Sequence, residues 1–305
     1  MSSENHEITL DPKSLEVSRL HAYLLASVAP RPIAFASTVD KKGNINLSPF
    51  SFFNVFSSNP PVMIFSPSRR GKDSTQKDTY INIKEVPEVV INIVNFDIVE
   101  KMSLASTAYE KDINEFVKAG LSAVPSDIVK PPRVGEAPIA FECKVREVIS
   151  LGSGGGAGNL VLAEVHRMHF KESYLKENGL PDSTKLDLVG RMGENWYIRA
   201  SRESLFEIPK PLSVKGIGVD QLSQSIRNSN ILTANNLGRL GNVEKLPDEK
   251  ELSQAMHWEE VKEVFLEHEN QRDMIKDSLH HLGKRHLESG EVNKALTILM
   301  IVDKV

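Results

Sequence analysis

The feature that most constrains the fold of this chain is a tight turn at residues 40–44, between two β-prone runs. Residues 33–39 before the turn and residues 45–56 after it are rich in apolar, aromatic and hydroxyl side chains. An Asp-Lys-Lys-Gly-Asn sequence between such runs predicts a β-hairpin. A hairpin makes the first two strands antiparallel. It therefore argues against a doubly wound sheet, in which helices alternate with strands throughout.

The rest of the first two thirds of the chain continues this β-rich pattern. Further strands are expected at residues 62–65, 89–94, 139–149, 160–170 and 196–200. Helices are expected after Asp11-Pro12, at residues 75–86 and at residues 97–119. Many short strands with few helices predict a mainly β fold, a small antiparallel Greek-key-type barrel with peripheral helices.

The composition changes after Pro209-Lys210-Pro211. Strand signals nearly vanish, and apolar residues recur at helical spacing in residues 219–240 and 258–302. A proline-rich join of this kind is typical of a domain edge. We therefore expect two parts, a barrel at residues 1–210 and a helical C-terminal extension at residues 211–305.

Charge and composition exclude several classes of protein. The net charge of −4 and the pI near 6.2 provide no global basic field for nucleic acid. No apolar run reaches the roughly 18 residues of a membrane helix, and the start lacks a signal-peptide pattern, so the cytoplasm is the expected location. Nucleic acid and membrane are not expected partners.

Metal and disulfide chemistry is not expected either. Cys143 is the only cysteine, which excludes an intrachain disulfide and a multi-cysteine metal site. It lies in an apolar run and is interpreted as a buried strand thiol. His280, His281 and His286 do not share one helical face, so no metal site is predicted.

Two segments combine hydroxyl groups with β-prone backbone. Ser37 and Thr38 end the first apolar run, where they either start the turn or face a ligand. Residues 46–53, Asn-Leu-Ser-Pro-Phe-Ser-Phe-Phe, carry a mid-strand proline, which interrupts the ladder and exposes backbone amides. A flat heteroaromatic ring needs amides and hydroxyls along its edge and an apolar wall across its face. The alternative interpretation is an edge strand with a bulge.

A basic loop follows at residues 66–79. It gathers hydroxyls, two arginines and two lysines before and within the first turn of a predicted helix, which suits a phosphate group. The glycine spacing of a Walker loop is missing. The alternative is a solvated basic loop.

Two further features leave alternatives open. The glycine run at residues 152–158 has no following helix, so a dinucleotide fingerprint is excluded and a flexible hairpin loop is favoured, although small residues also admit a ligand ring. His169 lies near a strand end, where it is either a structural or surface histidine or a catalyst.

Taken in order, these segments resemble the flavin reductase-like, FMN-binding split-barrel family over about residues 20–200. The resemblance rests on Pro30-Arg31-Pro32-Ile33-Ala34 with Ser37-Thr38, on residues 46–53, Asn59-Pro60-Pro61-Val62, residues 77–83, Gly158-Asn159-Leu160-Val161 through His169, and Gly190-Arg191-Met192-Gly193. The resemblance implies a split barrel, commonly a homodimer, with FMN near the dimer interface.

The resemblance also implies roles by position. Ser37 and Thr38 are expected near the ribityl chain or the ring. Contacts to the isoalloxazine are expected from Asn46, Ser48, Pro49, Phe50 and Ser51. The phosphate end is expected at Ser66, Ser68, Arg70, Lys72, Lys77, Asp78 and Thr79. The choice between Arg69 and Arg70 stays open.

The function that the resemblance implies first is an NAD(P)H-dependent flavin reductase, which transfers hydride from nicotinamide to flavin. This chemistry belongs to the cofactor and needs no acid–base residue, although His169 is a candidate beside the nicotinamide. One alternative is a flavoredoxin-like FMN electron carrier. Another is a non-enzymatic binding module with the helical extension as its functional part.

Overall fold

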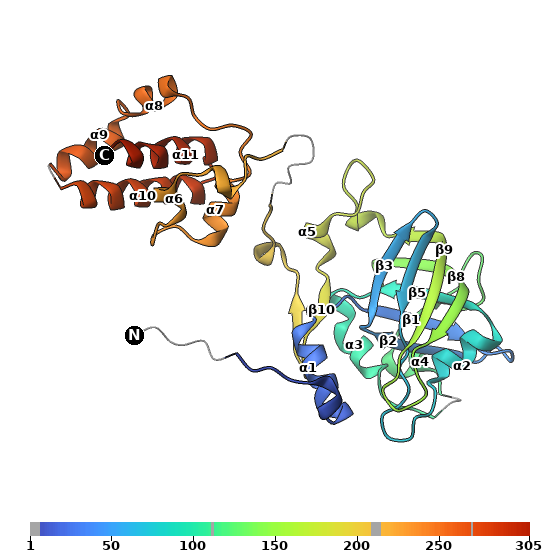
Figure 1. The fold of residues 1–305 in the computed structure, drawn as a ribbon. Coiled ribbons are helices and arrows are strands. Elements are labelled where there is room, and N and C mark those ends of the chain that lie inside the picture. The colour runs from blue at the N-terminus through green and yellow to red at the C-terminus, as the bar shows by residue number, and fades with distance from the viewer. Residues whose placement is uncertain (1–6, 111–112, 209–214, 270) are drawn as a thin grey trace. The chain divides into compact units, whose positions relative to one another are not determined.

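The computed structural model describes residues 7–110, 113–208, 215–269 and 271–305, and it contains the predicted hairpin. Strands β1 (Ala34–Val39) and β2 (Ile45–Phe50) pair antiparallel across the turn, with Thr38 opposite Asn46. The described residues form a seven-stranded antiparallel sheet in the order β2-β1-β5-β8-β9-β4-β3 (Figure 1). Its other strands are β3 (Phe53–Ser58), β4 (Pro61–Phe65), β5 (Glu88–Ile93), β8 (Ile139–Ser150) and β9 (Asn159–Phe170).

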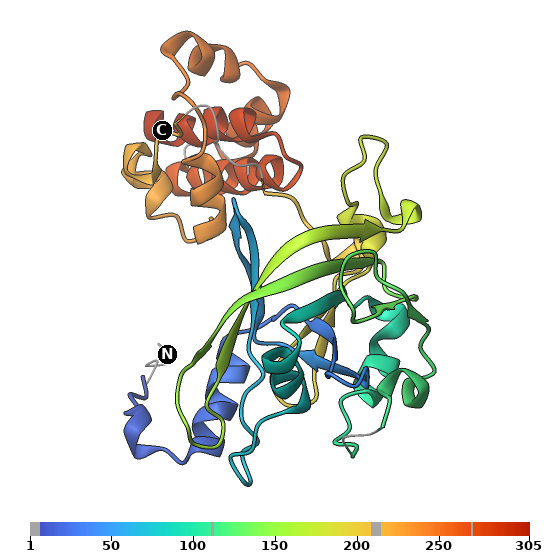
Figure 2. The same ribbon diagram turned by 90° about the vertical axis from the view of Figure 1, so that its right-hand side faces the viewer.

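The expected single strand at residues 45–56 is wrong, because the chain leaves the sheet at Ser51 and Phe52. β2 and β3 are neighbours in sequence but lie at opposite edges of the sheet order. The two residues between them therefore carry the chain from one edge to the other, which curls the sheet into a split barrel. Figure 2 shows the long β8–β9 hairpin of this barrel.

The two faces of the sheet bury different cores. Strand alternation directs Ala36 and Phe50 to the barrel interior, where they pack with Phe65 and Cys143. The other face carries Phe35 and Leu47, and it packs against residues of α3 and α4 such as Met102 and Phe116. The buried thiol predicted for Cys143 is confirmed.

Short helices cover the barrel: α1 (Val17–Ser27), α2 (Asp78–Glu85), α3 (Val99–Leu104), α4 (Glu115–Ala119) and α5 (Ser183–Leu186). The single helix expected at residues 97–119 is wrong. The Asn114 side chain accepts a hydrogen bond from the Phe116 amide and starts α4 as a separate helix. The strand expected at residues 196–200 is β11 (Tyr197–Arg199), but its partner β10 (Val189–Arg191) was not predicted. The pair of β6 (Ala123–Val124) and β7 (Arg133–Val134) was not predicted either.

Contacts between residues divide the chain into two units, Met1–Phe206 and Glu207–Val305. The proline-rich join at residues 209–211 lies outside the described residues. The second unit is helical, with α6 (Gln224–Arg227), α7 (Ala234–Leu240), α8 (Glu249–Ala255), α9 (Glu259–Glu267), α10 (Arg272–Glu288) and α11 (Val292–Ile301).

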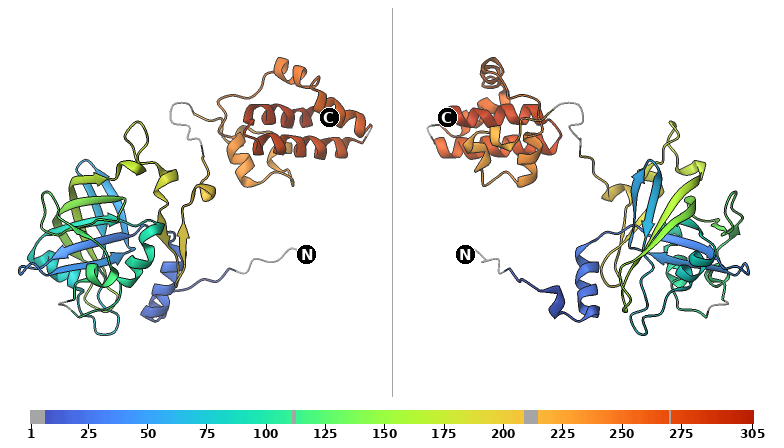
Figure 3. Two further views of the ribbon diagram at one scale, coloured as in Figure 1. Left: turned by 180° about the vertical axis from the view of Figure 1, so that it is seen from behind. Right: turned by 45° about the vertical axis from the view of Figure 1, so that its right-hand side comes forward.

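The second unit buries its own apolar stripe. Helices α10 and α11 run side by side (Figure 3), and Leu279 and Leu282 pack with Ile298 and Ile301. A Cβ at Gly283 would lie 2.5 Å from Leu299, so glycine permits this close approach. No described helix is long and apolar enough to cross a membrane.

Candidate functional site

A buried polar cluster joins the first hairpin to α2. The Thr38 hydroxyl oxygen accepts hydrogen bonds from the side-chain amides of Asn82 (3.2 Å) and Asn46 (3.5 Å). The Asn46 amide also donates to the Thr79 hydroxyl (2.9 Å). Thr79 and Asn82 are one helical turn apart, so α2 presents both to the hairpin. These hydrogen bonds fix the start of α2 against β1 and β2.

Lys77, the residue before α2, carries a half-buried ammonium group. Its Nζ lies 5.3 Å from the centre of the Phe50 ring. Burial lowers the pKa of Lys77, and the nearby Arg70 lowers it further. Among the described residues no carboxylate lies within ion-pair distance of this ammonium. A desolvated cation without a counter-ion is a good receptor for an anion.

The two arginines of the basic loop have different partners. Arg70 pairs with Asp78 (3.1 Å) and also donates to the Thr75 hydroxyl (3.3 Å) and the Gln76 carbonyl. Arg69 donates to the Ser74 carbonyl (3.0 Å), and its Nε is buried without an acceptor among the described residues. Arg70 is thus held within the loop, whereas Arg69 retains an unused donor.

Asn159, at the start of β9, connects the basic loop to the sheet. Its backbone amide donates to the Ser66 hydroxyl (3.0 Å), and its side-chain amide donates to the Pro67 carbonyl (2.8 Å) and Gln76 Oε1 (3.0 Å). The Asn159 side chain is fully buried, and Oδ1 has no donor among the described residues. An unused acceptor therefore lies in the same loop region as the unused donor of Arg69.

The glycine-rich loop between β8 and β9 pairs with the basic loop. The Arg69 amide donates to the Ala157 carbonyl (2.9 Å), and the Gly156 amide donates to the Arg69 carbonyl (3.1 Å). A Cβ at Gly155 would lie 2.7 Å from the Gly71 carbonyl oxygen, and one at Gly158 would lie 2.7 Å from Ser66 Oγ. Glycine at these two positions therefore permits the close contact between the two loops.

The remaining predicted positions do not all share one face. Thr38 and Phe50 face the barrel interior, whereas Ser37 and Pro49 alternate to the face under α3 and α4. Ser37 is fully buried and its Oγ has no partner in the described chain. Ser48 and Ser68 are half-buried, and Ser51 is half-buried beside an arginine. Lys72 is exposed.

Ser51 is part of an arginine clamp that the sequence analysis did not identify. The buried Arg31 donates from Nε to the Ser51 hydroxyl (3.3 Å) and from its terminal nitrogens to the Leu25, Val28 (2.7 Å) and Met192 (2.8 Å) carbonyls. These contacts join the end of α1, the β2–β3 crossover and the β10 turn. Burial lowers the pKa of Arg31, and the charge of Arg191 lowers it further.

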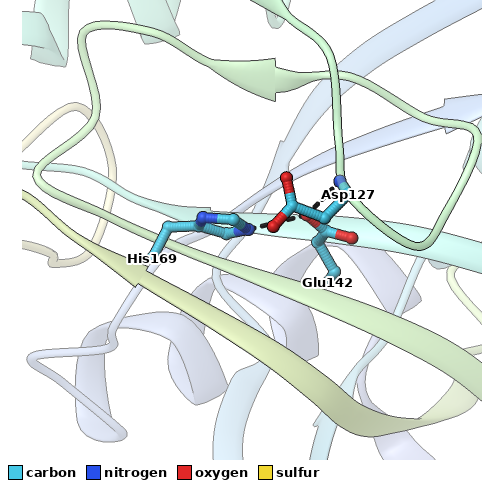
Figure 4. Close-up of side chains that lie close together, drawn as sticks. All are labelled: Asp127, Glu142 and His169. Carbon is cyan, nitrogen blue, oxygen red and sulfur yellow. Dashed lines mark hydrogen bonds and ion pairs between the residues drawn. The ribbon is translucent and has the colours of Figure 1, made fainter.

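His169 lies apart from the predicted flavin residues. It lies near the C-terminal end of β9, whereas Asn159 begins that strand. Its cross-strand partner is Ala140 of β8. Figure 4 shows its ring directed at Glu142, with Nε2 2.6 Å from Oε1. Asp127 lies beside them. The side-chain atoms of the three residues that could coordinate a metal ion lie within 4.8 Å of one another.

The Glu142 carboxylate already has partners. It accepts hydrogen bonds from the amides of Asp127 and Ile128, both at 2.8 Å. Burial alone would raise its pKa, but these bonds and the contact with His169 hold the pKa of Glu142 below its ordinary value. The cluster is therefore a set of hydrogen bonds that holds the 120–138 loop to β8 and β9.

Several polar residues of the site were given no role from sequence: Asn82, Asn159, Gln76 and the clamp residue Arg31. Arg69 was named only as the alternative to Arg70. A local signal existed for Asn159, a polar residue directly after the glycine run at the start of a strand. Asn82 gave a weaker signal, because it is one helical turn from Thr79. The loop pairing that brings Gln76 to Asn159 joins residues 83 positions apart and has no local signature.

Comparison with known proteins gives a consistent picture for the first unit. The sequence model of the flavin reductase like domain family matches residues 26–185. An uncharacterized protein of Aquifex aeolicus is 35% identical over 196 residues, which cover 64% of this chain and 97% of that protein.

Two solved structures resemble the same unit. Nitrilotriacetate monooxygenase component B from Bacillus cereus is 27% identical with a TM-score of 0.62, covering 68% of this chain and 99% of that chain. The 2-nitrobenzoate 2-nitroreductase of Pseudomonas fluorescens is 28% identical with a TM-score of 0.59, covering 68% of this chain and 100% of that chain.

Proposed function

Because this chain belongs to the flavin reductase-like domain family, we propose that its first unit binds FMN and reduces it with NADH or NADPH. The family supports flavin-linked oxidoreduction or electron transfer. FMN as the particular flavin and a nicotinamide as the reductant are our finer proposals. The bound flavin supplies the hydride-accepting ring, and the protein positions and shields it.

The observation that carries the proposal is the half-buried Lys77 ammonium, which lies over Phe50 with no carboxylate partner among the described residues. A flavin phosphate would supply the missing negative charge. The unused Arg69 Nε and Asn159 Oδ1 fit the same ligand, as a donor to an anionic oxygen and an acceptor for a ribityl hydroxyl. The residues present therefore fit a phosphorylated polyhydroxyl cofactor.

We keep the positions implied by the family resemblance as proposed FMN contacts: Ser37, Thr38, Asn46, Ser48, Pro49, Phe50, Ser51, Ser66, Ser68, Arg70, Lys72, Lys77, Asp78 and Thr79. To these we add Arg69 and Asn159. We do not extend the catalytic proposal to His169, because its ring is paired with Glu142 at the far end of β9.

The proposal is tested by titrating the apoprotein with FMN and with riboflavin, following the quenching of flavin fluorescence. A charge-assisted contact contributes about 1.5–3 kcal/mol, so FMN should bind at least tenfold more tightly. Lys77→Gln should abolish most of this preference. Lys84→Gln, at an exposed lysine of α2 outside the proposed contacts, is the matched control. Equal affinity for the two flavins refutes the phosphate assignment.

Turnover separates a reductase from an electron carrier. Steady-state oxidation of NADH or NADPH should require added FMN or enzyme-bound FMN and should follow the FMN affinity of the variants. A protein that binds FMN tightly but oxidises neither nicotinamide would be an electron carrier, which would overturn the reductase proposal while leaving the flavin site intact.

We also propose a homodimer. Val55 and Phe56 of the edge strand β3 are 57% and 65% exposed, an apolar pair of the kind that a subunit interface covers. Light scattering after gel filtration measures the mass, and an aspartate at Phe56 should shift it toward that of one chain.

We further propose that residues 211–305 are not needed to hold the flavin.

A further inference from the structure

The helical unit contains a polar cavity that the proposed flavin chemistry does not use. Its volume is about 540 Å³, within the usual range for small-molecule sites. Nine of its ten lining residues are polar or charged, and they come from α6, the segment after it and α10. The charged groups are Asp273, Lys276 and Asp277, and the buried polar residue of the lining is His280.

The hydrogen bonds of Ser229 define the tautomer of His280. Ser229 Oγ accepts from the backbone amides of Ile231 (3.2 Å) and Leu232 (3.3 Å). Both lone pairs are then used, so the hydroxyl proton is donated to His280 Nδ1, 3.2 Å away. The neutral ring consequently carries its proton on Nε2.

This Nε2–H group is an orphan donor. The His280 side chain is 7% exposed, and Nε2 is buried without an acceptor among the described residues. Buried donors are nearly always bonded, so an unpaired one beside a polar cavity indicates a ligand acceptor. Burial lowers the pKa of His280, and this outweighs the opposite effect of the Asp277 and Asp303 charges, which raise it. The ring therefore stays neutral near pH 7.

The charges of the lining define the complementary ligand. Asp273 and Asp277 lie at i and i+4 and therefore on one face of α10, with Lys276 beside them. Two carboxylates and one ammonium give the lining a net charge of −1. A ligand with a cationic end, a carboxylate and a net charge of +1 satisfies both signs.

A metal ion fits this lining less well. Among the described residues, His280 belongs to no group of three side chains close enough to coordinate one ion. The amides and hydroxyls that surround the carboxylates favour an organic ligand with several donors and acceptors.

We propose that this cavity binds a small ligand of the basic amino acid class. Asp273 and Asp277 receive its cationic groups. Lys276 and the Nε2–H of His280 bind its carboxylate, and the amides of the α6 segment complete the contacts. This site is independent of the proposed flavin function.

Isothermal titration of the full chain with L-arginine tests the proposal. Binding with a Kd of roughly 1 mM or tighter is expected. L-citrulline, which replaces the guanidinium with a neutral group of similar shape, and agmatine, which lacks the carboxylate, should each bind at least tenfold more weakly. No heat of binding for L-arginine, or equal affinity for L-arginine and L-citrulline, overturns the proposal.

Two variants with the same loss of charge on α10 locate the site. Asp277→Asn, at an exposed position of the lining, should weaken L-arginine binding at least tenfold. Glu288→Gln, exposed on the same helix but outside the lining, should leave the affinity unchanged. Equal affinity of the two variants means that arginine binds elsewhere and refutes the cavity assignment.

Discussion

Replacing Arg31 by methionine should destabilise the first unit, because a single buried guanidinium joins three parts of the fold. It donates to the Leu25, Val28 and Met192 carbonyls and to the Ser51 hydroxyl. Methionine fills much of the same volume but donates no hydrogen bond. The end of α1, the β2–β3 crossover and the β10 turn would then lose their common partner.

The magnitude follows from the contacts. Four hydrogen bonds from a charged donor, at about 1.5–3 kcal/mol each, give an upper limit of about 6–12 kcal/mol. Two corrections reduce it. Val28 is exposed, so its carbonyl regains water, and burial of the guanidinium itself costs desolvation energy, as its lowered pKa indicates. We expect a net loss of about 2–4 kcal/mol, or roughly 5–15 °C in Tm.

Urea denaturation of a Trp258→Phe background measures this loss, because Trp196 is then the only tryptophan and reports on the first unit. Arg19→Met is the control, since Arg19 is exposed on α1, where its guanidinium lies over the Tyr23 ring. It should cost less than about 0.5 kcal/mol. If Arg31→Met changes stability no more than this control, the clamp does not stabilise the fold.

Three further outcomes are expected. Gly158→Ala should cost roughly 1–3 kcal/mol, because its Cβ would meet Ser66 Oγ at 2.7 Å, whereas Gly154→Ala has open space and should be neutral in the same urea assay. Burial alone would raise the pKa of Glu260, but hydrogen bonds from Lys294 and His286 lower this pKa overall. The ionised Glu260 therefore stabilises the helical unit at pH 7, and this stabilisation is lost as pH falls below about 4.3. Glu260→Gln should reduce the acid sensitivity of thermal unfolding of the helical unit. Burial raises the pKa of Cys143 to about 12, so iodoacetamide should label it at pH 8 only after unfolding, as mass spectrometry would detect.

The sequence predicted the parts of the fold that depend on local patterns. The Asp-Lys-Lys-Gly-Asn turn gave the β1–β2 hairpin, because turn chemistry and flanking β-prone runs act over a few residues. The break at Ser51 and Phe52 was missed, because aromatic residues stand on both sides of Ser51 and continue to Phe53. What separates β2 from β3 is the closure of a distant sheet edge, which no local pattern records.

The same distinction applies to the site. Thr38, Asn46 and Thr79 were named from sequence and lie in one hydrogen-bonded cluster. Ser37 and Pro49 were named with them, but strand alternation directs them to the opposite face. The clamp of Arg31 was missed because its carbonyl partners are backbone groups, which no residue type reveals.

The paired loops around Gly155 and Gly158 have a consequence for modification of the protein. Because backbone hydrogen bonds join Arg69 to Gly156 and Ala157, neither loop can be lengthened without displacing the other. An epitope or dye inserted into the glycine-rich hairpin tip would therefore disturb the neighbourhood of Lys77, although this tip looks in the sequence like a tolerant insertion point.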